Sequence, residues 1–301
     1  MSVQQKNSIN CPYCDNLGTY FCHADDKLQK FVPGTFIYYK CNKCKALFQF
    51  PLPTINDIFS FYPNVGYRPY TKTTHSRHDW TILGALPATG HILDVGCGGG
   101  NALLDFKNHH QNWFFTGIDF SDTAIACAAN SLPEGKFLQG DANVILKELS
   151  KDTYDVVLAH DIIEHVVEPK IFILNLSKIL KPGGKIYLTL PNSTSITMKI
   201  FRSLAYHLEA PRHLTVPSIK SIEILASQNG LIVNKIEGEV GGAMFWKSLP
   251  FSYAKAGWAY KLKWIQLGML FTSLFKKFLP DTFSMVKIIL VKDVSQDKMH
   301  K

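Results

Sequence analysis

Short apolar runs, each followed by a glycine-rich or polar segment, recur through the middle of the chain. Runs of this kind are typical of buried parallel strands, and the segments between them are long enough to form helices. We expect a helix over residues 101–110, because its apolar side chains fall on one side. Strands are expected at residues 91–95, 113–118, 136–139, 154–159 and 186–191. This alternation predicts an α/β sheet with helices on both faces.

The C-terminal part of the chain continues the pattern with a long interruption. Residues 218–228 are expected to form a helix, residues 231–236 a sixth strand and residues 285–291 a seventh. The sequence Leu-Lys-Pro-Gly-Gly-Lys at 180–185 predicts a helix stop and a turn before the fifth strand. Over 40 residues separate the sixth strand from the seventh.

The first expected strand runs into a glycine turn, Leu-Asp-Val-Gly-Cys-Gly-Gly-Gly, at residues 93–100. Glycine lets the backbone of such a turn approach a ligand closely. A dinucleotide-binding fingerprint has glycine at the first, third and sixth positions of the turn. Counted from Gly96 as the first position, the sixth is Asn101. The spacing is instead Asp-x-Gly-x-Gly-x-Gly, which begins at Asp94.

This spacing resembles motif I of the class I S-adenosylmethionine-dependent methyltransferases. Further motifs of that family follow in order: Asp119 ends the second strand, Gly-Asp-Ala at 140–142 ends the third, and His-Asp-Ile-Ile-Glu-His at 160–165 ends the fourth. The resemblance covers roughly residues 75–293. It is closest to the branch that includes ubiquinone-type O-methyltransferases and methyltransferases that modify sugars and natural products.

The resemblance implies a Rossmann-like, seven-stranded methyltransferase sheet that binds S-adenosylmethionine. It implies that Asp119 binds the ribose hydroxyls, that Asp141 and the neighbouring backbone hold the adenine, and that the segment from His160 faces the methyl group. Taken singly, each strand-end acid could instead be an ordinary capping residue. The implied cofactor-binding residues are Asp94, Gly96, Cys97, Gly98, Gly100, Asp119, Phe120, Asp141, Ala142 and His160.

Seven cysteines include two Cys-x-x-Cys pairs separated by 26 residues. Two such pairs can place four thiolates tetrahedrally about one structural zinc ion, so the metal ligands are expected to be Cys11, Cys14, Cys41 and Cys44. Disulfides would be the alternative in a secreted domain. The polar start of the chain lacks the apolar core of a signal peptide, which favours a reducing cytoplasm. Free thiols are expected at Cys22, Cys97 and Cys127.

The expected domain organisation is a zinc-ribbon-like module at 1–54, a linker with leading helices at 55–90, the methyltransferase domain at 91–293 with an insertion at 240–282, and a polar tail at 294–301. Residues 55–62 are expected to form a short helix. Tyr62 and Tyr67 either reach the active site or pack the two modules together. Because the two apolar cores are expected to be separate, loss of zinc should loosen the first 60 residues and leave the cofactor domain folded.

The net charge of +8 lies mostly in the C-terminal part, since residues 240–301 hold ten lysines against three aspartates. Residues 243–280 contain six lysines, no acidic residue and ten aromatic residues, including Trp246, Trp258 and Trp264. Such a segment suits peripheral contact with an anionic membrane, here the inner face of the cell membrane. Its uninterrupted apolar stretch of about 12 residues is too short to span a bilayer. The alternative is a lid over the acceptor pocket.

The leading function is methyl transfer from S-adenosylmethionine to a small-molecule, glycan or lipid-linked acceptor, with O-methylation favoured. The alternative is an RNA methyltransferase that binds nucleic acid through the zinc ribbon. Nucleic acid is disfavoured, because the fourth strand lacks the Asp/Asn-Pro-Pro-aromatic motif of base-modifying enzymes and the basic residues lie outside the ribbon. A non-catalytic binding protein is disfavoured because the cofactor motifs are intact.

An acceptor hydroxyl needs a base, and the candidates are His165, after the fourth strand, and His213, after the fifth. Either histidine could instead only pack or bind backbone. A magnesium-dependent mechanism would require clustered carboxylates, and the segment after the fourth strand offers only Asp161 and Glu164. Magnesium is therefore not invoked.

Overall fold

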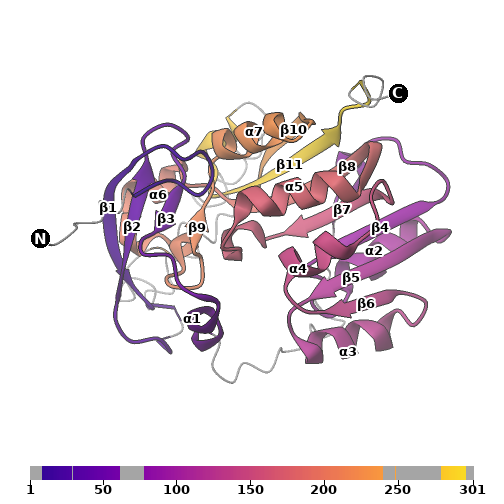
Figure 1. Cartoon of the computed structure of the whole chain (residues 1–301), viewed down its shortest axis with the longest axis horizontal. Coiled ribbons are helices and arrows are strands. Elements are labelled where there is room, and N and C mark those ends of the chain that lie inside the picture. Colours follow the sequence, from indigo (N-terminus) through magenta and orange to yellow (C-terminus); the bar gives the residue numbers. More distant parts are fainter. Residues whose placement is uncertain (1–8, 29, 62–77, 240–247, 249–278, 296–301) are drawn as a thin grey trace, which may run out of the picture.

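The structure is a computed structural model of the chain and describes residues 9–28, 30–61, 78–239, 248 and 279–295. These residues form a seven-stranded sheet and a four-stranded sheet that lies at one end of it (Figure 1). The N-terminal part of the chain belongs to the small sheet, and the segments from residue 90 onward build the large one.

The large sheet has the strand order β10-β11-β8-β7-β4-β5-β6. The strands from β4 to β8 pair in parallel, whereas β11 is antiparallel to both of its neighbours. Its members are β4 (Gly90–Val95), β5 (Trp113–Asp119), β6 (Lys136–Gln139), β7 (Tyr154–His160), β8 (Leu180–Pro191), β10 (Leu231–Glu239) and β11 (Met285–Lys292). The expected seven-stranded, Rossmann-like sheet is confirmed.

The strand order reverses at β4, because the chain runs from β4 outward to β6 and then returns to place β7 on the other side of β4. Loops that leave the carboxyl ends of strands at such a switch point diverge, and α/β proteins bind their ligands there. The glycine turn follows β4, and the segment from His160 follows β7. Two of the expected cofactor segments therefore start at the switch point.

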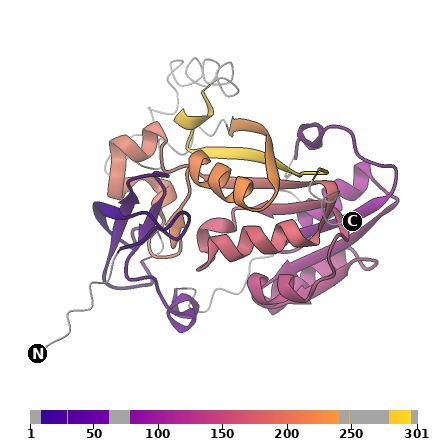
Figure 2. The same ribbon diagram turned by 45° about the horizontal axis from the view of Figure 1, so that its top comes forward.

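Helices cover both faces of the large sheet (Figure 2). Helices α4 (Ala142–Glu148), α5 (Pro169–Ile179) and α7 (Ile219–Gln228) pack on the face that includes Leu93. The 3-10 helix η1 (Trp80–Leu83) and helix α2 (Asn101–His109) pack on the opposite face, which includes Ile92. Adjacent strand residues point to opposite faces, which explains why two helix layers are needed to bury one run of apolar residues.

The small sheet combines distant parts of the chain. Its order is β1-β2-β3-β9, with β1 (Gly18–Asp25), β2 (Thr35–Cys41) and β3 (Leu47–Gln49) from the N-terminal module and β9 (Thr215–Val216) from the segment after β8. Strand β9 pairs antiparallel with β3. Helix α6 (Ile196–Phe201) precedes β9, and its Met198 packs in the core of this sheet.

The expectation of two separate cores is wrong. The two Cys-x-x-Cys pairs, at residues 11–14 and 41–44, are called the cysteine knuckles. Their buried residues Cys11 and Cys44 belong to the same apolar cluster as Ile219 and Ile222 of α7. Hydrogen bonds join the same parts: the Tyr13 hydroxyl lies 2.8 Å from Thr215 Oγ1. The knuckles are therefore packed into the large domain and not attached to it through a linker.

Two element boundaries differ from expectation. Strand β8 begins at Leu180 and not at residue 186, because Leu180 already pairs with Tyr154. The pairing then jumps to Val156 opposite Lys185, so the expected turn is an irregularity within the strand, with Gly183 at φ +76°. The short helix expected at 55–62 is α1 (Ile55–Ser60).

The insertion lies outside the described residues, apart from Ser248 and residues 279–282. Tyr62 and Tyr67 also lie outside them. The expectations of a lid, of membrane contact through residues 243–280 and of tyrosines near the active site therefore stay predictions. Among the described helices, none has the length and apolarity needed to cross a membrane.

Candidate active site and metal centre

The turn after β4 requires glycine at three alternate positions. Gly96, Gly98 and Gly100 have φ values of +77°, +52° and +80°, in the left-handed region that side chains disfavour. A Cβ at Gly96 would also lie 3.2 Å from Ile162 Cδ1, so the turn packs directly against the segment after β7. Gly100 is the N-cap of α2. The backbone N–H groups of a turn that opens a helix are suited to a polar ligand.

Asp119 connects this turn to the end of β5. Its Oδ2 accepts a hydrogen bond from the Gly98 N–H at 2.8 Å, and its Oδ1 accepts one from the Ser121 N–H at 2.9 Å. A carboxylate has about four acceptor sites, so both oxygens can accept further hydrogen bonds from a ribose. The ring of the next residue, Phe120, is 53% exposed beside them.

Asp141 follows β6 and caps a helix. It is the N-cap of α4, which begins at Ala142, and its Oδ1 accepts a hydrogen bond from the Val144 N–H at 3.1 Å. The capping alternative for this acid is therefore confirmed as one of its roles. The Gly140 N–H donates to the Asp119 carbonyl at 2.9 Å, which holds the ends of β5 and β6 together.

Asp94 lies beneath the turn, where it is 3% exposed. Burial, and then the neighbouring carboxylate of Asp119, raises its pKa to about 7. The nearby Cys97 thiol is also buried, and its pKa is raised by burial. Asp94 therefore places a buried titratable carboxyl group beneath the turn and is not itself exposed at the surface.

Asp94 is expected to make the protein without cofactor less stable as the pH rises from about 4 to about 7. The unfolded chain releases the proton near the ordinary pKa, whereas the folded chain keeps it until about 7. Asp94 therefore contributes stability at low pH that is lost through this window, by up to about 1.4 kcal/mol per pH unit. Urea unfolding of wild type and Asp94→Asn across this range should show a flatter profile for the variant. The exposed Asp122→Asn should behave as wild type, and parallel profiles for wild type and Asp94→Asn would contradict the burial argument.

His160, at the end of β7, lies in a stack of rings. Its ring centroid is 4.9 Å from that of His78 and 4.8 Å from that of Tyr187. Burial lowers the pKa of His160 to about 3, so the imidazole is neutral. These contacts are made on the α2 face of the sheet, so its expected role in cofactor binding stays a prediction.

The two candidate bases lie together. The rings of His165 and His213 are 4.8 Å apart, edge to face, although they are far apart in the sequence. His165 belongs to the 3-10 helix η2 (Ile163–His165) after β7, and His213 precedes β9. Burial lowers the pKa of His165 to about 3 and that of His213 to about 4. Both imidazoles are therefore neutral at physiological pH, and weak as bases in the protein alone.

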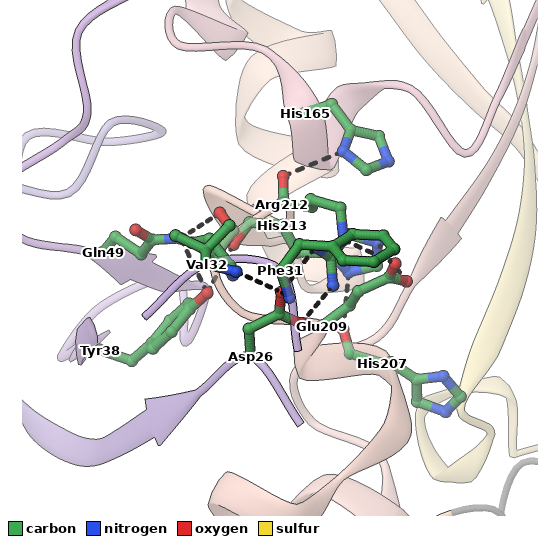
Figure 3. A network of polar contacts seen from close by, with 11 residues as sticks. Asp26, Phe31, Val32, Tyr38, Gln49, His165, His207, Glu209, Arg212 and His213 are labelled. Carbon is green, nitrogen blue, oxygen red and sulfur yellow. Dashed lines mark hydrogen bonds and ion pairs between the residues drawn. The ribbon is translucent and has the colours of Figure 1, made fainter. Parts of the chain in front are cut away.

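Buried polar groups of the small sheet hold the segment that contains His213 (Figure 3). Asp26 accepts two hydrogen bonds from the Arg212 guanidinium, at 2.7 and 3.1 Å. The Tyr38 hydroxyl donates to the His213 carbonyl at 2.7 Å, and Gln49 Nε2 donates to the same carbonyl at 3.1 Å. The N-terminal module therefore fixes the backbone at one of the two histidines.

Glu164 joins the histidine pair. One carboxylate oxygen of Glu164, one ring nitrogen of His165 and one ring nitrogen of His213 lie within 4.8 Å of one another. Glu164 is 1% exposed, and burial raises the pKa of its carboxyl well above the ordinary value. The sequence indicated Glu164 only as one of two carboxylates after the fourth strand, because its closeness to His213 depends on the fold. The Asp26–Arg212 pair gave no signal in the sequence.

The four expected zinc ligands form one compact group. Their Sγ atoms lie within 4.8 Å of one another, with Cys11 to Cys44 at 3.5 Å and Cys14 to Cys41 at 3.4 Å. Four sulfurs around a zinc ion at about 2.3 Å would be about 3.8 Å apart, so the group fits the ion. The Tyr13 N–H donates to Cys11 Sγ and the Cys44 N–H donates to Cys41 Sγ, both at 3.4 Å.

The remaining cysteines, Cys22, Cys97 and Cys127, are free thiols, as expected. Cys22 and Cys97 are buried. None of the three belongs to the group of four sulfurs, so among the described cysteines only those of the knuckles could bind a metal ion together.

Comparison with known proteins places these features in a family. Residues 93–186 match a methyltransferase domain. The ubiquinone biosynthesis O-methyltransferase of Coxiella burnetii (strain RSA 493 / Nine Mile phase I) is 31% identical over 106 residues, which cover 34% of this chain and 44% of that protein. The enzyme of the same name from Idiomarina loihiensis is 30% identical over 166 residues, which cover 50% of this chain and 68% of that protein.

Some of these matches are partial. The chain spans less than half of the length of the Coxiella burnetii relative. Among solved structures, a SAM-dependent methyltransferase from Methanosarcina mazei has a TM-score of 0.49 and 15% identity, over 71% of this chain and 97% of that one. The matched methyltransferase domain and the Idiomarina loihiensis relative, together with the strand order and the glycine turn, show that the chain belongs to the class I S-adenosylmethionine-dependent methyltransferases.

Proposed function

We propose that this methyltransferase transfers the methyl group of S-adenosylmethionine to a hydroxyl oxygen of a small molecule. The observation that carries the proposal is the contact between the glycine turn and the segment after β7, at Gly96 and Ile162. A cofactor seated on the turn would have that segment, and with it His165, beside it. The relatives named as ubiquinone biosynthesis O-methyltransferases support oxygen as the methyl acceptor.

The cofactor is proposed to lie across the carboxyl ends of β4, β5 and β6. Asp119 would accept hydrogen bonds from the ribose hydroxyls, since its carboxylate keeps free acceptor sites beside the turn that it anchors through the Gly98 N–H. Phe120, Asp141 and Ala142 would line the adenine side, and the backbone of Gly96, Cys97, Gly98 and Gly100 would contact the amino acid part of the cofactor. Asp94, beneath the turn, and His160, at the end of β7, are also proposed to contribute to cofactor binding.

Methyl transfer from a sulfonium is an in-line displacement, so the alignment of the acceptor with the methyl group is the main contribution of the protein. We propose that His165 and His213 hold the acceptor hydroxyl in line. Their pKa values of about 3 and 4 in the protein alone make proton abstraction a weaker role than orientation. Their closeness, at 4.8 Å between ring centroids, supports a shared substrate contact.

Residues 1–54 are proposed to be a zinc ribbon whose ion is structural. Four thiolates would complete a tetrahedral zinc site, which leaves no position for a substrate. Its role would be to hold the small sheet, which in turn fixes the backbone at Pro211 and His213 through Gln49. In this proposal the ribbon supports the active site of the domain at residues 91–293 and does not bind the substrate itself.

The acceptor class is proposed from the sequence alone. The basic, aromatic composition of residues 243–280 suits a lipid-linked or glycan acceptor at an anionic membrane. Sedimentation with acidic and neutral vesicles tests the membrane contact. Equal sedimentation with both kinds of vesicle would leave a soluble small molecule as the acceptor.

The experiment that tests the function is to incubate purified enzyme and S-adenosylmethionine, labelled in the methyl group, with lysate of the native host. Soluble, lipid and RNA fractions are then analysed for label. Label in a small molecule or a lipid that base leaves in place and that hydriodic acid releases as methyl iodide, as it does from a methyl ether, supports O-methylation. Label in RNA would overturn the proposal in favour of a nucleic acid acceptor.

A further inference from the structure

We infer that Asp26 is a positioning residue of the methyl-transfer site and that it acts through Arg212 on both candidate histidines. The inference rests on the proposed function, in which His165 and His213 hold the acceptor hydroxyl. Asp26 follows β1 in the N-terminal module, and Arg212 lies 186 positions further along the chain. The part of Asp26 in the reaction is to hold other groups in place, without contact to the acceptor or the cofactor.

Arg212 is the residue that connects the two histidines. Its backbone carbonyl lies 3.0 Å from His165 Nδ1, and the next residue in the chain is His213. A carbonyl only accepts, so His165 Nδ1 carries the proton and the lone pair of the ring is on Nε2. His213 Nδ1 lies 2.7 Å from the His207 carbonyl, so its ring has the same tautomer. A shift of the Arg212 backbone would therefore displace both imidazoles.

The side chain of Arg212 also orients an acid beside one of these rings. Its Nε donates to Glu209 Oε1 at 3.2 Å, and the second carboxylate oxygen of Glu209, Oε2, lies 3.6 Å from His213 Nε2. Glu209 has φ +30° and ψ +49°, a left-handed conformation that a non-glycine residue adopts only when its surroundings hold it there. A carboxylate so close to an imidazole favours positive charge on the ring, so the position of Glu209 influences how well His213 accepts a hydrogen bond from a hydroxyl.

Asp26 fixes the guanidinium group of Arg212 (Figure 3). Its Oδ1 accepts from Nη2 at 2.7 Å, and its Oδ2 accepts from Nη1 at 3.1 Å. The same Oδ2 accepts hydrogen bonds from the N–H groups of Phe31 and Val32, at 3.0 and 3.2 Å. A bidentate pair of this kind sets both the distance and the plane of the guanidinium. One carboxylate therefore joins the loop after β1 to the segment that contains His213.

Stability alone does not explain this ion pair. The side chains of Asp26 and Arg212 are only 1% and 5% exposed, and replacement of such a buried pair by apolar residues of similar volume is often neutral or stabilising. Apolar side chains cannot supply direction, however. Arg212 points Nε at Glu209 and both Nη atoms at Asp26, so the plane of one guanidinium determines where the Glu209 carboxylate lies.

Asp26→Asn tests the inference with little change in side-chain shape. Each carboxylate oxygen accepts from Arg212, so the amide nitrogen would face an N–H group in either orientation. With labelled S-adenosylmethionine and the host fraction that wild type labels, the initial rate should fall about 10- to 100-fold, because a small misplacement of reacting groups is enough for such a loss. The KM for S-adenosylmethionine should stay unchanged. The control is Asp25→Asn, which should react as wild type, since Asp25 is exposed and bonds Thr35 within the same module.

The double variant Asp26→Asn/Arg212→Met separates positioning from folding. It keeps an acceptor for the N–H groups of Phe31 and Val32 and buries no unpaired charge, so its Tm should be close to that of wild type. Its rate should stay as low as that of Asp26→Asn, because Glu209 has lost the guanidinium. Recovery of the rate together with the Tm would show a merely structural role and overturn the inference. A wild-type rate in Asp26→Asn would overturn it as well.

Nuclear magnetic resonance of protein labelled with ¹⁵N-histidine gives a readout that needs no acceptor. In wild type, His165 and His213 should both appear as neutral rings protonated at Nδ1. Asp26→Asn should shift the signals of both rings and leave those of the exposed His109 unchanged. Unchanged signals of the pair would contradict the inference.

The two proposals can fail separately. If wild type labels RNA or nothing, the proposed function fails, and the imidazole signals alone decide whether Asp26 positions the pair. If wild type methylates a hydroxyl and Asp26→Asn reacts equally fast, only the positioning role fails.

Discussion

Replacement of Cys41 by serine is expected to remove the zinc and to unfold the large domain together with the small sheet. Structural zinc sites contribute on the order of 10–16 kcal/mol in zinc-finger peptides, whereas a whole domain is stable by only about 5–15 kcal/mol. The loss cannot stay local, because Cys41 and Cys44 belong to the same core as α7. Ser218 of the α7 cap also donates its hydroxyl hydrogen bond to the Cys44 carbonyl.

Metal analysis and thermal unfolding, followed by circular dichroism, measure this effect. Cys22→Ser is the matched control, since Cys22 is buried in β1 but lies outside the group of four sulfurs. The control should keep its zinc and most of its stability. If Cys41→Ser loses zinc yet the large domain melts as in wild type, the two parts are energetically independent. The shared core would then contribute little to the stability of the large domain.

Replacement of His165 or His213 by alanine is expected to slow turnover by about 100-fold or more, with little change in cofactor affinity. His165 follows β7 and His213 lies against it, whereas Asp119 ends β5, which is on the other side of β4 in the sheet. The double variant should be little slower than either single variant, because residues that act as one unit are not additive. Steady-state kinetics with the identified acceptor, and titration with S-adenosylhomocysteine, provide the two measurements.

His109→Ala is a suitable control, because His109 is an exposed residue at the end of α2. It should leave turnover unchanged. Near-full turnover in His165→Ala and His213→Ala would mean that alignment by other groups drives the transfer, and that the pair has a packing role only.

The sequence predicted the large sheet well because its signals are local. A buried strand such as β7 is a short apolar run, and the left-handed turn after β4 needs glycine at Gly96, Gly98 and Gly100. The cysteine spacing likewise predicted the group of four sulfurs. In each case a few neighbouring residues are enough to determine the geometry.

The small sheet and the histidine cluster depend on contacts that no local pattern records. Strand β9 has two residues and forms only because β3 lies beside it. The ion pair between Asp26 and Arg212 joins residues that are 186 positions apart in the sequence, so neither residue stood out there. The same holds for Glu164, whose neighbour His213 comes from another part of the chain.

Calorimetric titration with S-adenosylmethionine and S-adenosylhomocysteine tests the central claim, that a nucleoside cofactor binds on the glycine turn and Asp119. We expect each to bind wild type with one site per chain, NAD⁺ not to bind, and Asp119→Ala to lose most of the affinity, since the ribose would lose a charge-assisted acceptor. The exposed Asp122→Ala should bind as wild type. Absence of binding to wild type by both the methyl donor and its product would contradict the account.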